Sequence, residues 1–103
     1  MLQAKERRKF KKDVEEYMKG KWFKKWSGIR NAPEARQNLK ITANTRDKRD
    51  FDFFPGLLLE KVERNENHYS IRINRQWRIF FVWENNQAWE IDLSKHDYKK
   101  INR

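Results

Sequence analysis

The second half of the chain alternates apolar and polar residues, and this pattern limits the possible folds more than any other feature. Three segments, HYSIRIN, QWRIFFVWE and QAWEIDLS, are rich in aromatic and β-branched residues, which is typical of antiparallel strands. Every second side chain of a strand points to the same face of a sheet. The odd-numbered positions therefore form the predicted core face: Tyr69, Ile71, Ile73, Trp77, Ile79, Phe81, Trp83, Trp89, Ile91 and Leu93.

The loops between these segments follow from the same pattern. Core residues stay on one side only if the loops have about three residues, which are 74–76 and 85–87. Two-residue loops would set Ile73 beside Arg78 and Phe81 beside Glu90. The three-residue register instead places Arg78 opposite both Arg72 and Ser94, on the face away from the core.

The first half of the chain has helical spacing. One helix is predicted over 3–19, and Gly20 stands where a C-terminal cap is expected. A second helix is predicted to start at Asn31, with Pro33 in its first turn, and to end near Asn44. The residues predicted to face inward are Phe10, Val14, Tyr17, Met18, Ala35, Leu39, Thr42 and Ala43.

These elements predict an α+β protein in which two N-terminal helices pack on an antiparallel sheet of about four strands, followed by a short C-terminal tail. Leu57 to Val62 supplies the remaining strand. A chain of 103 residues accommodates one core, so we expect a single domain over 1–103. Its basic helical part is 1–54, and its sheet and functional tail are 55–103.

Charge gives the first indication of function. The net charge is +10, and the first 50 residues hold 16 of the 25 Lys and Arg residues but 7 of the 15 acidic ones. The electrostatic field of this positive charge attracts polyanions such as RNA or DNA, although a solvated basic surface without a ligand explains the charge equally well. With no cysteine and two histidines, we expect no metal site and no cofactor. The N-terminal sequence lacks an apolar run, which predicts a cytoplasmic protein without membrane contact.

Two arginines facing each other across a strand pair repel, which makes this position chemically informative. Either Asp92 and Glu90 neutralise Arg72 and Arg78, or the pair is ready for an anion such as a phosphate. The alternation continues to His96, which would reach the same face near the turn at 75–76. The cluster predicts a phosphodiester site, while a structural ion-pair cluster with a surface histidine remains the alternative.

The segment YSIRINRQWRIFFVW, residues 69–83, resembles HigB-type toxins, which commonly read YSIRxNxQWRIxFxW. Upstream, GKWFKKWSGIRNAPEARQNLKITANT from Gly20 resembles the GK, W-x-x-I and A-x-R-x-L pattern of that family, and PGLLLEKV is similar to its PPGNRLEAL. The likeness covers about 20–94. It implies a RelE-like fold and an activity that many such toxins share, the cleavage of mRNA in the ribosomal A site.

The resemblance also implies roles for particular residues. Arg78 in QWRI matches the arginine that RelE-like enzymes use against the scissile phosphate. The family usually ends in DYH, whereas this chain ends in SKHDYKKINR. An ungapped alignment puts His96 at the tyrosine position and Asp97 at the histidine position, and aligning DY on Asp97 and Tyr98 puts Lys99 there. The resemblance therefore does not decide which residues act as the acid and the base. The family usually begins with a short apolar strand, and this chain begins with a charged segment, so that strand is either missing or displaced.

The expected mechanism is metal-independent attack of the RNA 2′-hydroxyl on the adjacent phosphate, which leaves a 2′,3′-cyclic phosphate. Arg78 and Arg72 would stabilise the charge of the transition state. His96, whose reference pKa is about 6.5, would transfer protons, and Tyr98 would stack, orient the substrate or share the proton transfer. The residues expected to bind RNA are Lys61, Arg64, Arg75, Lys11, Lys12, Lys24 and Lys25.

The resemblance also implies partners: a HigA-like antitoxin, often a helix-turn-helix protein, together with the ribosome and mRNA. Operator DNA would be contacted only through the antitoxin. Three alternatives remain. They are a ParE-like toxin that inhibits gyrase, a noncatalytic RNA-binding module in which Phe80 would stack on a base, and an inactive relative with an altered C-terminal motif.

Overall fold

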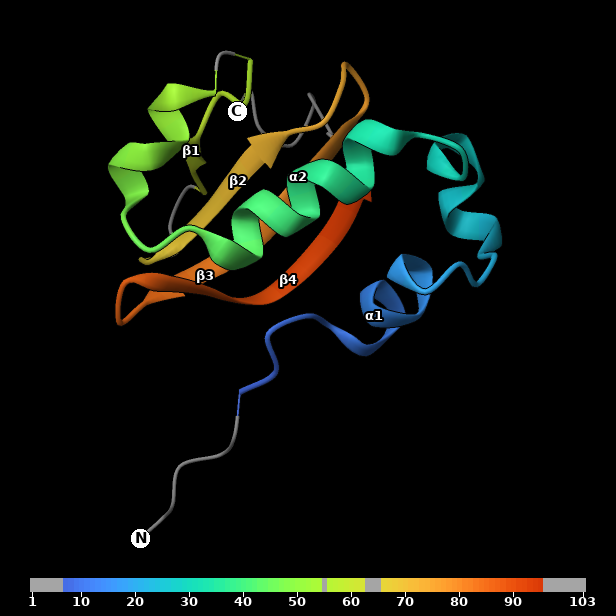
Figure 1. Ribbon diagram of the computed structural model, residues 1–103, viewed down its shortest axis with the longest axis horizontal. Coiled ribbons are helices and arrows are strands. Elements are labelled where there is room, and N and C mark those ends of the chain that lie inside the picture. The colour runs from blue at the N-terminus through green and yellow to red at the C-terminus, as the bar shows by residue number, and fades with distance from the viewer. Residues whose placement is uncertain (1–6, 55, 63–65, 96–103) are drawn as a thin grey trace, which may run out of the picture.

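The computed structural model describes residues 7–54, 56–62 and 66–95, and shows helices followed by a four-stranded antiparallel sheet. In Figure 1, α2 lies across one face of this sheet. The predicted α+β class is confirmed. The helices are α1 (Lys12–Met18), the 3₁₀ helices η1 (Lys24–Ile29) and η2 (Lys48–Phe53), and α2 (Pro33–Asn44), and the strands are β1 (Glu60–Lys61), β2 (His68–Arg72), β3 (Trp77–Glu84) and β4 (Gln87–Lys95).

The strands lie side by side in the order of the chain, β1-β2-β3-β4, and each neighbouring pair is antiparallel. Arg78 pairs with Arg72 on one side and with Ser94 on the other, which confirms the predicted register. β1 is shorter than the predicted strand over 57–62. Leu58 has φ +48, a left-handed conformation that interrupts an extended strand.

The turn between β3 and β4 has two residues, so the predicted three-residue loop over 85–87 is wrong. Glu84 pairs directly with Gln87, which leaves Asn85 and Asn86 as the loop. Their φ values of 54 and 59 are those of a type I′ turn, a conformation that asparagine tolerates better than most residues.

A β-bulge in β4 compensates for the shorter turn. Val82 pairs with Trp89, whereas Phe80 pairs with Asp92, so two residues of β4 face one of β3. Glu90, with φ 54, takes up the extra residue. Between the turn and the bulge the faces are therefore exchanged. Ala88 occupies the core face, and Trp89, which was predicted to point inward, lies on the other face.

The core lies between the helices and the sheet. Most of the predicted inward residues are buried, and partly buried Tyr69 and Ile73 pack at its margin. Phe51 of η2 adds an aromatic side chain that contacts Phe81 and Trp83, with ring centroids 5.7 and 6.0 Å apart. The buried hydrophobic residues are Val14, Tyr17, Trp26, Ile29, Ala35, Leu39, Phe51, Leu57, Ile71, Trp77, Ile79, Phe81, Trp83, Ala88, Ile91 and Leu93.

The N-terminal segment differs from its prediction, because α1 begins at Lys12 and not near residue 3. Residues 8–11 run extended and parallel beside β4. The backbone nitrogen of Lys11 donates to the oxygen of Ile91 at 3.0 Å, and that of Glu90 donates to the oxygen of Arg8 at 2.8 Å. Unpaired groups along the edge of a sheet favour such pairing. The segment occupies the place of an edge strand, and Phe10 still packs against the core.

The second helix ends at Asn44 as predicted, and Ala35, Leu39 and Thr42 are buried on its inner face. Its N-cap is Ala32, without a side-chain hydrogen bond, so the expected capping role of Asn31 is wrong.

The bulge makes residue 90 sensitive to the shape of its side chain. Glu90→Val should lower the free energy of unfolding by about 1–2 kcal/mol, because a β-branched residue is strained at positive φ. Glu90→Gly should retain the wild-type value or exceed it. Urea unfolding measures both, and equal stability of the two variants would contradict the bulge.

Candidate active site

Arg78 is buried near the start of the central strand β3, on the face of the sheet away from the helices. Only 4% of the residue is exposed, although its guanidinium is charged. Its Nε donates to the Ser70 hydroxyl at 2.9 Å, and its Nη2 donates to the carbonyl oxygens of Leu58 at 2.7 Å and Ser70 at 3.3 Å. A buried charge is tolerated only when such bonds satisfy it. Strand β2 and the segment before β1 therefore hold the guanidinium in a fixed orientation.

Glu60 supplies a carboxylate beside this arginine. Its Oε1 lies 3.7 Å from Arg78 Nη2, and the Glu60 side chain is 51% exposed. Asp92, which the sequence offered as a neutralising group, is paired with Lys11 at 3.7 Å instead. Sequence reasoning missed Glu60 because the alternation pattern does not fix the register in which β1 pairs with β2. The one available signal was an acidic residue in the predicted strand over 57–62.

Arg72 lies opposite Arg78 and is partly exposed. Both backbone polar groups of Arg72 form hydrogen bonds. Its nitrogen donates to the Leu57 oxygen at 2.6 Å, and its oxygen accepts from Asn38 Nδ2 at 3.2 Å. Arg72 and Arg75 line a cavity of about 500 Å³ between α2, the segment 54–57 and the β2–β3 turn. The structure thus gathers three of the predicted arginines at one end of the sheet.

The other predicted site residues of the sheet half are not all gathered there. Lys61 pairs with Tyr69, whose ring contacts Phe81 on the core face, so alternation directs Lys61 away from Arg78. Arg64, His96 and Tyr98 lie outside the described residues. Their convergence with the arginines remains a prediction.

The basic residues of the first half divide into engaged and exposed lysines. Lys11 is paired with Asp92, and Lys25 donates to Asp13 Oδ2 at 2.6 Å. This bond to Lys25 lowers the pKa of the Asp13 carboxyl below its ordinary value. Two further lysines are exposed and carry their charge into solvent: Lys12 in α1 and Lys24 in η1.

The part of the chain that the structure describes also bears on metal binding and membrane insertion. Among its residues, no group of three or more His, Cys, Asp or Glu side chains is arranged to hold a metal ion. The same residues contain no helix with the length and apolar character needed to cross a membrane.

Residues 9–96 match the family described as the RelE-like toxin of the type II toxin-antitoxin system HigB. The chain belongs to this HigB-like toxin family. The match begins at the extended segment beside β4 and includes the whole described sheet. No curated protein matches the chain. Toxins of this family act as halves of toxin-antitoxin pairs, which implies a cognate antitoxin for this HigB-like chain, and they are generally ribonucleases.

The fixed orientation of Arg78 in this HigB-like toxin depends on Ser70. Ser70→Ala should lower the free energy of unfolding by about 1–3 kcal/mol, because it removes the acceptor of a buried charged donor. Ser94→Ala is the matched control. Ser94 flanks Arg78 on the other strand, is exposed, and donates to Lys95, so its loss should change stability by less than about 0.5 kcal/mol. Urea unfolding of both variants tests this, and equal effects would contradict it.

Proposed function

We propose that this toxin cleaves mRNA on the ribosome through attack of an RNA 2′-hydroxyl on the neighbouring phosphate. The observation that carries the proposal is the pairing of Arg72 with Arg78 on the outer face of the sheet. Two like charges opposite each other destabilise a sheet, and a negatively charged ligand would relieve this repulsion. A phosphodiester that becomes more negative in its transition state fits this arrangement.

The position of Glu60 supports an anion site beside Arg78. Its carboxylate lies beside Arg78, but 3.7 Å is longer than a charge-assisted hydrogen bond, and the side chain is half exposed. A substrate phosphate would take its place and form shorter bonds to the guanidinium. Because Arg78 is nearly inaccessible before this exchange, we expect Glu60 and the neighbouring residue Leu58 to shift when RNA binds.

Proton transfer is assigned to His96, with Tyr98 as a second participant. The position of Lys95 supports this assignment, because Lys95 pairs with Trp77 at the end of β4, beside the β2–β3 turn, and precedes His96 in the sequence. That turn carries Arg75 and borders Arg72.

Contacts with ribosomal RNA are assigned to the exposed lysines. Lys11 and Lys25 must break their ion pairs with Asp92 and Asp13 before they bind a phosphate. Lys12 and Lys24 are exposed and can bind a phosphate directly. Binding through such contacts weakens as salt rises, because counterions released from RNA drive it. Lys12 and Lys24 should therefore contribute more to ribosome binding than Lys11 and Lys25.

Induced expression in cells, with mapping of mRNA 5′ ends, tests the activity. Wild type should arrest growth and produce cuts inside translated codons. Arg78→Ala should lower cleavage on the order of 100- to 1000-fold, as the loss of one transition-state donor does, and Arg72→Ala should also reduce it. His96→Gln tests the proton-transfer role.

Arg49→Ala is the control, because the side chain of Arg49 in η2 is 87% exposed and pairs with the N-cap residue Asp47. It should leave arrest and cleavage unchanged. Since Arg78 is buried, the folding of each variant is checked by its melting temperature. Arrest without new mRNA ends would replace RNA cleavage by a gyrase-directed or purely binding toxin, and a wild type that does not arrest growth would indicate an inactive relative.

A further inference from the structure

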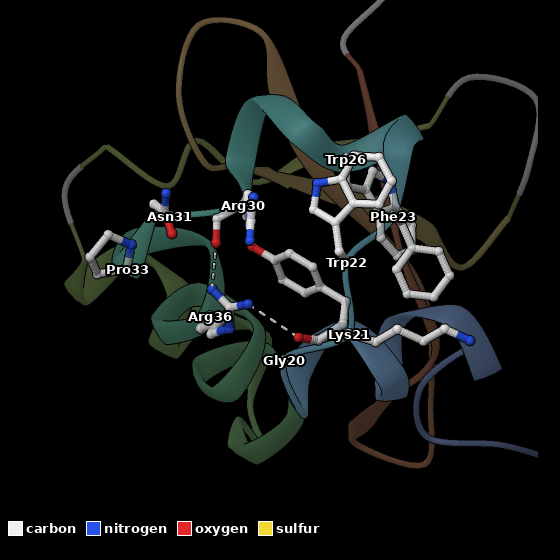
Figure 2. Close-up of a pocket in the computed structure, with 10 residues that line it drawn as sticks. Gly20, Lys21, Trp22, Phe23, Trp26, Arg30, Asn31, Pro33 and Arg36 are labelled. Atoms are coloured by element: carbon white, nitrogen blue, oxygen red, sulfur yellow. Dashed lines mark hydrogen bonds between the residues drawn. The ribbon is translucent and has the colours of Figure 1, made fainter.

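A second pocket lies on the helical side of the molecule, apart from the arginine pair. It has a volume of about 470 Å³ and is enclosed by the end of α1, the connection over 20–23, η1 and the start of α2. Figure 2 shows the aromatic side chains Trp22, Phe23 and Trp26 on one side of it and Arg30 and Arg36 on the other. Neither the expected catalytic residues nor the expected RNA-binding lysines line this pocket.

The pocket is a built feature, because its walls are joined by specific bonds. The Tyr17 hydroxyl donates to the Ile29 oxygen at 2.6 Å, and burial raises the pKa of this hydroxyl, so it stays protonated. Arg36 donates to the oxygens of Arg30 and Tyr17, each at 3.2 Å, and its guanidinium lies 4.3 Å from the centre of the Tyr17 ring. Gly20, at φ +103, reverses the chain after α1.

One aromatic side chain of the pocket is exposed without a role in the core. Trp26 is buried and packs on Phe23 with ring centroids 5.1 Å apart. Trp22, by contrast, is 52% exposed, although a tryptophan ring gains much by being covered. An exposed indole at the edge of a pocket provides a flat apolar surface on which another ring can stack.

The charge of the pocket selects the kind of ring. Among the described residues that line it, three are cationic, Lys21, Arg30 and Arg36, and none is acidic. Lys21 and Arg30 are exposed, whereas Arg36 is already bonded to backbone oxygens. Lys21 Nζ lies 5.4 Å from the centre of the Phe23 ring, which keeps this charge beside the aromatic side of the pocket. A ligand that combines a flat ring with neighbouring negative charge would contact both the Trp22 indole and the exposed cations, and a nucleotide unit has this combination.

We propose that this pocket binds an unpaired nucleobase of single-stranded RNA, with the base stacked on Trp22 and its flanking phosphates bound by Lys21 and Arg30. The proposal rests on the proposed function in taking RNA as the ligand. The location agrees with it. Gly28 of η1 packs against the indole of Trp77, the neighbour of Arg78 in β3, and a Cβ at Gly28 would lie 3.4 Å from Trp77 Nε1. Trp26 of η1 lines the pocket, so the pocket lies near the end of the sheet that carries the arginine pair, but on the opposite side of the sheet.

The test is the binding of a fluorescently labelled, 2′-O-methylated single-stranded RNA, followed by anisotropy with the full-length protein. This RNA lacks the attacking hydroxyl, so binding is measured without cleavage. Trp22→Ala should weaken binding by about 5- to 150-fold, the range for loss of one stacked base, and Trp22→Phe should recover part of it. Arg30→Gln should reduce the magnitude of the slope of log affinity against log salt by about 0.7.

Matched controls separate stacking from general charge. Phe53→Ala removes an aromatic ring that is 76% exposed but lies outside the pocket, and Lys40→Gln removes an exposed charge of α2 outside the pocket. Both should bind the RNA within about twofold of the wild type. The same sequence as a duplex should bind more weakly, because its bases are already stacked.

Wild-type affinity in Trp22→Ala would overturn the proposal, as would a duplex that binds as well as the single strand. If Trp22→Ala weakened only the binding of the purified antitoxin, the pocket would be an antitoxin site and the proposal would be wrong. Failure of the proposed function is distinguishable. A wild type that does not cleave mRNA, but whose RNA binding depends on Trp22, would leave the pocket in place and remove the nuclease.

Discussion

The rest of the site depends on the burial of one positive charge, that of Arg78. A guanidinium inside the sheet requires acceptors, and the structure provides them from Ser70 on β2 and from the carbonyl of Leu58 before β1. Leu58, whose carbonyl accepts this bond, has a left-handed backbone conformation. The same bonds attach the short edge strand to the sheet and bring Glu60 beside the arginine. Stability and the proposed chemistry are therefore coupled in one side chain.

The sequence was sufficient to predict the parts of the fold that follow from alternation. Side chains on one face of a strand share an environment, so the aromatic residues at odd positions identified the core and placed Arg72 opposite Arg78. Alternation does not report on backbone conformation. The two-residue turn at Asn85 and the bulge at Glu90 differ from the prediction and compensate each other, so Ser94 still pairs with Arg78 while Trp89 changes face.

Helical periodicity was misleading where tertiary pairing decided the structure. Phe10 fits a helical stripe with Val14, yet residues 8–11 pair with the open edge of β4 and only the residues from Lys12 form a helix. The sequence identified the arginines of the site but not Glu60 or the near-complete burial of Arg78, since both depend on how β1 approaches β2. The pocket at Trp22 was likewise missed, because its walls come from three separate segments.

The most direct measurement of the central claim is single-turnover cleavage of mRNA on programmed ribosomes, with one 2′-deoxynucleotide placed at the scissile position. If the 2′-hydroxyl is the nucleophile, the all-ribose mRNA is cut and leaves a 2′,3′-cyclic phosphate, and the substituted mRNA is not cut at that position. Equal cleavage of the two mRNAs would contradict the account, because the account assigns the attack on the phosphate to the substrate's own 2′-hydroxyl.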